Sequence, residues 1–151
     1  MAPSTKADFH GSARRHMEDA DLLESNNRLP NAGHLYGFVA ECGLKALLIG
    51  LGHPTDQEGS PLKQKGSPDF RVHIDRFLDP STFASLKLFL NRRAGAQYLA
   101  LLSGIGDFSD WRVAHRYYSE SALPASLVKW KAAAHEVGRM LDRAKTDGVM
   151  S

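Results

Sequence analysis

The stretch from Asn31 to Leu51 constrains the fold more than any other part of the chain. Between Leu35 and Leu51 its only formally charged residues are Glu41 and Lys45, and its apolar residues occupy every side of a helical wheel. A surface helix has an apolar stripe on one side only, so a helix of this kind must be surrounded by other elements. The sequence therefore predicts a buried central helix over this stretch, with Asn31 as its N-cap.

Three polar side chains, those of His34, Glu41 and Lys45, form one line along this otherwise apolar helix. At about 100° per residue they fall within roughly 20° of each other. A carboxylate in an apolar setting is costly unless a cation pairs with it. Glu41 therefore predicts a cationic partner elsewhere in the chain, and we take Arg116 as the other half of a buried ion pair.

Apolar residues at helical spacing predict further helices on both sides of the central one. The Asn26–Asn31 break is short, so the first two helices should form an antiparallel hairpin. The segment 108–119 is rich in aromatic residues and is expected to be irregular or a single turn. No segment alternates at period two, so the predicted fold is all-α. The additional helices are expected at residues 10–26, 70–78, 80–103 and 124–145.

The length of 151 residues suits one domain. We expect a flexible N-terminal arm over residues 1–9, a single helical domain over 10–147 and a mobile loop over 52–69, where proline and glycine replace large apolar residues. The N-terminus lacks the apolar run of a signal peptide and no charge-free span is long enough to cross a membrane, which predicts a cytoplasmic protein with no membrane association. The single cysteine, Cys42, is expected to be a buried small hydrophobe.

Several chemistries lack their sequence signature. There is no glycine-rich phosphate loop, no cysteine and histidine spacing for a metal, and no nucleophile elbow, so neither a metal nor a cofactor is expected. The net charge of +2 is too small to argue for a nucleic-acid partner. Some arginines could still form a basic face for RNA, the alternative being ordinary solvated charge on helices. These candidates are Arg92, Arg93, Arg139 and Arg143.

The central stretch resembles a known family. Ala40-Glu41-Cys42-Gly43-Leu44-Lys45-Ala46-Leu47, preceded by His34-Leu35-Tyr36-Gly37, is similar to the second helix of HEPN domains, which typically carries an Ala-x-Glu-x-x-Leu-Lys core. His73-Ile74-Asp75 and the Trp111–Tyr117 stretch are similar to features of one branch of that family. The resemblance implies a four- to five-helix up-and-down bundle, often a homodimer. It also implies either metal-independent RNA cleavage or a non-catalytic role beside a nucleotidyltransferase partner, in a toxin–antitoxin or defence pair.

Active HEPN members resemble one another in an arginine followed, after four to six residues, by a histidine. The histidine can move a proton near neutral pH and the arginine can stabilise charge on the phosphate. Here Arg112 and His115 have only two residues between them, while Arg28 and His34 have five but lie at the start of the second helix. We therefore expect a catalytically degenerate binding or regulatory module. The alternative is a metal-independent endoribonuclease that uses Arg112 and His115.

Overall fold

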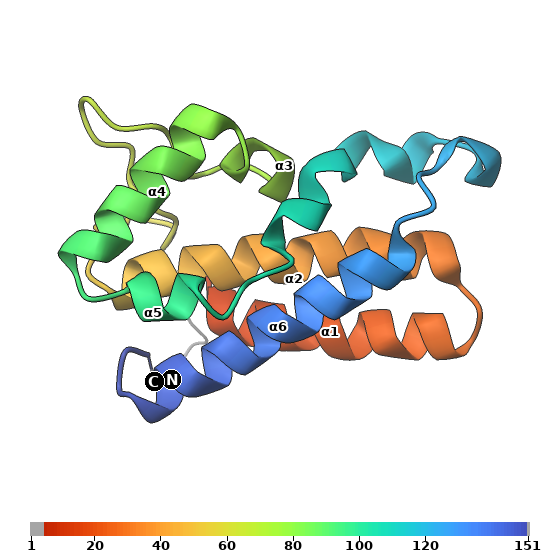
Figure 1. The fold of residues 1–151 in the computed structure, drawn as a ribbon, viewed down its shortest axis with the longest axis horizontal. Helices are drawn as coiled ribbons and strands as arrows, with labels where there is room; N and C mark the ends of the chain where they lie inside the picture. The colour runs from red at the N-terminus through yellow and green to blue at the C-terminus, as the bar shows by residue number, and fades with distance from the viewer. Residues whose placement is uncertain (1–4, 151) are drawn as a thin grey trace.

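The computed structural model describes residues 5–150, and within this range the chain forms helices and no strand (Figure 1). This confirms the all-α prediction for the described residues. Three helices have seventeen or more residues: α1 (Phe9–Ser25), α2 (Leu29–Gly50) and α6 (Leu127–Thr146). No helix in this range is both long enough and apolar enough to cross a membrane.

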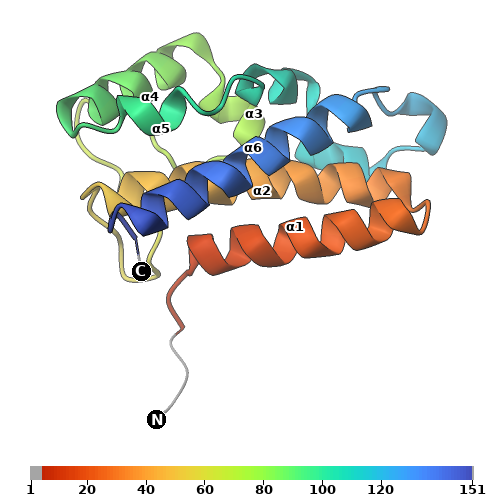
Figure 2. The ribbon, with the colours of Figure 1, turned by 60° about the horizontal axis from the view of Figure 1, so that its bottom comes forward.

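Helix α2 is the centre of the molecule, as the sequence predicts. It packs against α1 on one side and α6 on another, and its residues from Val39 to Leu48 are all buried. Helices α1 and α2 form the predicted antiparallel hairpin, whereas α6 runs in the same general direction as α2 (Figure 1). Figure 2 shows α1 on one side of α2 and the shorter helices on the other.

The chain between α2 and α6 forms short elements in place of further long helices. We call α3 (Ile74–Phe77), α4 (Pro80–Arg92) and α5 (Ala96–Leu99) the cap, which covers the C-terminal end of α2. Three 3₁₀ turns come after the cap, and we use the name arc for the segment that they form. They are η1 (Ile105–Asp110), η2 (Val113–Tyr117) and η3 (Glu120–Ala122). Only α1 and α2 therefore follow a simple up-and-down order.

The predicted helix over residues 80–103 is wrong in its second half. Helix α4 ends at Arg92, because Ala94 takes the left-handed backbone conformation with φ at 54°. Gly95 is also required for close packing, since a Cβ atom there would lie 2.5 Å from the side chain of Leu51. The chain turns at this point and α5 becomes a separate short helix.

Other predicted boundaries shift by a few residues. Helix α2 starts at Leu29 with Pro30 in its first turn, where a missing N–H costs nothing, so Asn31 lies inside the helix and is not its N-cap. Helix α6 starts at Leu127 and not near Pro124, and the segment 70–78 is helical only from Ile74 to Phe77.

The segment 52–69 contains neither helix nor strand, but it makes its own hydrogen bonds. Thr55 and Pro61 form an isolated antiparallel bridge, and Asp56 Oδ1 accepts hydrogen bonds from the backbone N–H groups of Glu58 (2.9 Å) and Ser60 (3.0 Å). The backbone N–H of Ala7 donates to the carbonyl oxygen of Glu58 at 2.7 Å, so the described part of the predicted arm contacts this loop. Residues 1–4 of that arm lie outside the described residues, and the mobility of the loop stays a prediction.

Candidate functional site

Two glycines on α2 allow the two tryptophans of the chain to pack directly against its backbone. A Cβ atom on Gly37 would lie 2.2 Å from the ring of Trp111, and one on Gly33 would lie 3.0 Å from the ring of Trp130. Trp111 from the arc is completely buried, and its indole N–H donates to the carbonyl oxygen of His34 at 3.3 Å. The spacing of four residues places both glycines on one side of α2, facing the arc and the start of α6.

A cavity of about 530 Å³ lies next to these tryptophans. It is enclosed by the N-terminal ends of α2 and α6 and by the arc, and its size is in the range of ligand pockets. Its apolar walls come mainly from leucine and proline side chains. The cavity is lined by Leu29, Pro30, Asn31, Gly33, His34, Trp111, His115, Arg116, Tyr118, Glu120, Leu123, Pro124, Ala125, Leu127 and Trp130.

His34 is the most unusual side chain of this cavity. Its ring stacks on Trp111 with centroids 5.1 Å apart and meets the edge of Phe38 at 5.0 Å. Both ring nitrogens are buried and have no hydrogen-bond partner within residues 5–150. The pKa of His34 is lowered, first by burial and then by electrostatic interactions, of which that with the Arg116 guanidinium is the largest. His34 is therefore a neutral imidazole at neutral pH.

The side chains of Arg112 and His115, the predicted catalytic pair, have different surroundings. The Arg112 guanidinium donates to the carbonyl oxygens of Ser109 (2.6 Å) and Trp111 (2.8 Å), and its Nε atom lies 3.8 Å from Asp75 Oδ2. Arg112 is not among the residues that line the cavity, whereas His115 is. The two residues contact each other through the Arg112 backbone, whose N–H lies 3.3 Å from His115 Nδ1 and whose carbonyl oxygen accepts from the His115 N–H at 3.1 Å.

His115 resembles His34 in its surroundings. Its ring lies nearly parallel to that of Trp130 at a centroid distance of 6.3 Å. Its pKa is lowered, first by burial and then by the nearby charge of Arg112. The cavity therefore holds two imidazoles that favour the neutral form.

The predicted ion pair between Glu41 and Arg116 is wrong. Glu41 Oε2 accepts from Lys45 Nζ at 2.9 Å, and Glu41 Oε1 lies 2.8 Å from His73 Nδ1. Lys45 is one turn along the same helix, so the predicted polar line of α2 supplies its own cation. Arg116 instead lines the cavity and its guanidinium lies 4.9 Å from the centre of the Tyr117 ring. Within residues 5–150 no carboxylate lies within salt-bridge distance of Arg116.

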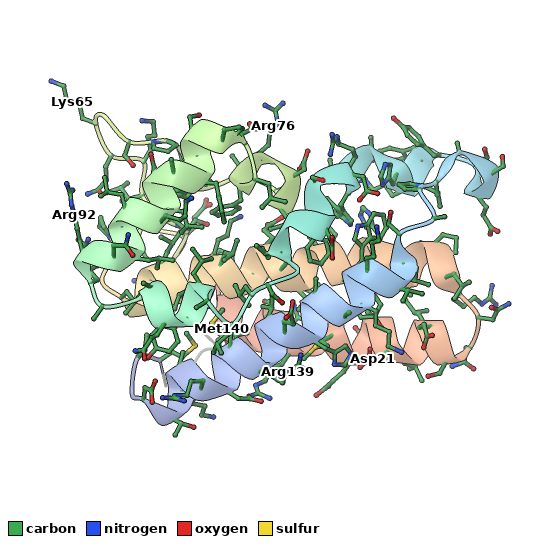
Figure 3. The ribbon with its side chains drawn as sticks, viewed as in Figure 1. Asp21, Lys65, Arg76, Arg92, Arg139 and Met140 are labelled. Carbon is green, nitrogen blue, oxygen red and sulfur yellow. The ribbon has the colours of Figure 1, made fainter. Side chains whose placement is uncertain are left out.

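The four arginines expected to form an RNA-binding face do not lie together. Arg92 projects from the end of α4 at the left of Figure 3, and Arg139 lies on α6 in the lower middle of that view. Arg93 lies 4.0 Å from the centre of the Phe89 ring, and Arg143 bonds to Asp147 at 3.1 Å. Two of the four arginines thus contact other groups of the chain, which fits the alternative of ordinary charge on helices.

Two other chemistries find no support in this geometry. Burial raises the pKa of the Cys42 thiol to about 12, so this side chain is the buried hydrophobe predicted and not a thiolate nucleophile. In the part of the chain that the structure describes, no three His, Cys, Asp or Glu side chains are placed to hold a metal ion.

Sequence reasoning missed how the cavity is assembled. It assigned Arg116 to structure and Arg112 to chemistry, and it did not include Trp130 or Glu120 in any site. The available signal was the pair of glycines four residues apart on a helix predicted to be central, together with only two tryptophans to fill the space beside them.

The search for known relatives adds nothing to this geometry. Comparison with models of protein families, with curated proteins and with solved structures gave no match to this chain. The functional argument therefore rests on the residues themselves.

Proposed function

We propose that this chain is a HEPN-like binding or regulatory module without nuclease activity, which acts as a homodimer or beside a nucleotidyltransferase-type partner in a toxin–antitoxin or defence pair. The Glu41-Cys42-Gly43-Leu44-Lys45 motif supports the family assignment, because in this chain the glutamate and the lysine form a buried pair at the centre of the bundle.

The placement of Arg112 is the observation that carries the proposal. Metal-independent cleavage of RNA needs an acid or base and a cation that converge on the same phosphate. The Arg112 guanidinium instead contacts two backbone carbonyl oxygens and Asp75, while His115 faces the cavity. This placement supports a binding role over a nuclease site made of these two residues.

A cleavage assay tests the proposal directly. Purified protein is incubated with a mixed RNA pool in excess chelator, beside an Arg112→Ala/His115→Ala double variant whose folding has been checked by circular dichroism. We expect wild type and variant to give the same background. Cleavage by the wild type that is lost in the folded double variant would overturn the proposal.

The alternative function is a metal-independent endoribonuclease, and one observation gives it a different set of residues. His34, His115 and Arg116 all line one cavity, so they bring together the two imidazoles and one guanidinium that such a reaction could use. If the chain cleaves RNA, we expect Arg116→Ala and His115→Ala to abolish cleavage. Arg112→Ala should retain it. The reverse pattern would restore the Arg112 and His115 pair predicted from the sequence.

A further inference from the structure

The cavity continues into a second hollow. This hollow has a volume of about 310 Å³ and is lined by Arg28 and Asn27 together with four residues that also line the cavity. The two spaces therefore adjoin each other at the N-terminal end of α2, and we call them together the groove. The shared residues are Leu29, Pro30, Asn31 and Glu120.

Exposed apolar side chains surround the mouth of this groove. Leu29 is 41% exposed and Tyr118 is 52% exposed, and both line the cavity. Tyr117 is 77% exposed and lies between two lining residues in the sequence. A small ligand would be covered by the cavity walls and would not need this surrounding surface, whereas a cavity with an apolar margin is typical of a protein docking site.

The charged groups at the groove favour an anionic partner. Arg116 lines the cavity and Arg28 lines the adjoining hollow, while Glu120 is the only carboxylate among the described residues that line either space. Neither guanidinium forms an ion pair within residues 5–150, so both can bind a carboxylate from outside. Arg116 also acts electrostatically on His34 at the base of the cavity.

We infer that this groove binds a segment of a partner protein in which a large apolar side chain is flanked by aspartate or glutamate. The apolar side chain fills the cavity between Leu29, Leu127 and Trp130. The flanking carboxylates bind Arg28 and Arg116. This inference rests on the proposed binding role and names the chemistry of the partner at the same site.

Single-stranded RNA fits the groove less well. Binding of single strands depends on aromatic faces for base stacking and on a row of cations for successive phosphates. Trp111 and Trp130 are buried, so Tyr118 is the one largely exposed aromatic side chain among the described lining residues, and Arg28 and Arg116 are the only lining arginines among them.

Selection from a random-peptide library tests the inference. A phage-displayed library of dodecapeptides is selected on the immobilised full chain, and enriched sequences are synthesised. We expect them to share a Leu, Phe or Trp next to Asp or Glu. Binding should change the intrinsic fluorescence, because both tryptophans of the chain line the cavity.

Two cavity variants with matched controls locate the binding site. Arg116→Glu, in η2, reverses a charge inside the groove, and Arg139→Glu makes the same charge change on α6, away from the groove. Ala125→Phe places a ring at the cavity, and Ala132→Phe places one on an exposed position of α6 away from it. Both alanines are exposed, so neither change is expected to disturb folding, which thermal melting checks.

The expected result is a loss of affinity for the selected peptide of about tenfold or more in the two groove variants and of less than about twofold in the controls. Failure to enrich any peptide, equal loss in groove and control variants, or selected peptides without acidic residues would overturn the inference. Displacement of the peptide by uncleaved single-stranded RNA with higher affinity would assign the groove to RNA. Each of these results leaves the proposed binding role standing, whereas cleavage of RNA in the separate assay would remove that role itself.

Discussion

The two halves of α2 use their polar groups in opposite ways. In the C-terminal half, Glu41 is hydrogen-bonded to Lys45 and to His73, so the buried charges are paired. In the N-terminal half, His34 has two buried ring nitrogens without a partner, and the nearby Arg116 forms no ion pair in the described part of the chain. The polar groups in the C-terminal half of α2 therefore have hydrogen-bond partners, whereas the His34 ring nitrogens in its N-terminal half have none among the described residues.

This difference separates stability from binding. A paired buried charge is expensive to disturb but offers little to a ligand, because its hydrogen-bonding groups are already occupied. Unpaired cationic and imidazole groups beside a cavity contribute less to folding and remain available to a partner. We therefore expect changes near Glu41 to reduce stability and changes near Arg116 to alter binding.

The largest effect is expected at the paired end. Glu41→Ala leaves the Lys45 ammonium buried without its carboxylate, which should lower the free energy of unfolding by about 3–5 kcal/mol. Urea denaturation followed by circular dichroism measures this change. Arg116→Ala, at the unpaired end, should change the same free energy by less than about 0.5 kcal/mol.

These two variants also test the correction made by the structure. If Arg116→Ala were as destabilising as Glu41→Ala, the ion pair inferred from the sequence would be right and the Glu41–Lys45–His73 cluster wrong. A double-mutant cycle between Glu41 and Lys45 should give a clear coupling energy, whereas one between Glu41 and Arg116 should give none.

The next largest effect is expected where α2 meets Trp111. Gly37→Ala would place a Cβ atom 2.2 Å from a completely buried ring, which cannot move without disturbing its neighbours. Even allowing for the better helix propensity of alanine, we expect a loss of about 2–3 kcal/mol in unfolding free energy. The near-ultraviolet circular dichroism of the tryptophans should also change.

Gly106→Ala is the matched control for this variant. A Cβ atom on Gly106 meets no heavy atom within 4 Å, and its backbone does not require glycine. Its unfolding free energy should stay within about 0.5 kcal/mol of the wild-type value. Equal losses in both variants would show that Gly37 is not needed for the packing of Trp111.

The sequence predicted the long helices because their apolar patterns are locally complete. Helix α2 lacks charge over several turns, and the line from Glu41 to Lys45 can be read from spacing alone. The same local logic failed after Arg92. The apolar period continues beyond that residue, but the left-handed backbone of Ala94 and the close packing of Gly95 end the helix.

The candidate site was predictable only in part, because its geometry depends on non-local packing. Arg112 and Arg116 are one helical turn apart in sequence and equally charged, and nothing in the local pattern says which of them faces the cavity. That choice is made by Asp75 and the backbone carbonyl oxygens that receive Arg112. The motif that resembles HEPN domains predicted residues at the centre of the bundle, because its Glu41 and Lys45 bond to each other there. It contains no residue that predicts the cavity.

A smaller effect on the free energy of unfolding is expected when low pH protonates His34 in the N-terminal half of α2. The pKa of His34 lies below its ordinary value of 6.5 in the folded chain, so as pH falls below 6.5 the unfolded chain binds protons first. Stability should therefore be fully present above pH 6.5 and decrease as pH falls toward the folded pKa. His10, His16 and His115 have lowered pKa values as well and should act in the same direction.

The variant His34→Phe separates this residue from the other histidines. It keeps a ring against Trp111 but cannot bind a proton, so its unfolding free energy should depend less steeply on pH below 6.5. Titration by nuclear magnetic resonance gives a second measure. In Arg116→Ala the pKa of His34 should move up toward 6.5, and an unchanged pKa would mean that the guanidinium does not act on the cavity.

The smallest effect is expected from Arg112→Ala, and it is the one that most sharply compares the two arginines of the arc. The guanidinium is half exposed and lies 3.8 Å from Asp75, so its removal should cost about 0.5–1 kcal/mol of unfolding free energy, as for other partly exposed ion pairs. Because the Arg112 side chain does not line the groove, affinity for a peptide selected on the wild type should change by less than about twofold. Arg116→Ala should have the reverse effects: the free energy of unfolding should stay unchanged, and the affinity for the peptide should fall. If Arg112→Ala weakened the peptide as much as Arg116→Ala does, the guanidinium of Arg112 would belong to the binding surface, and the division of roles between these two neighbouring arginines would have to be abandoned.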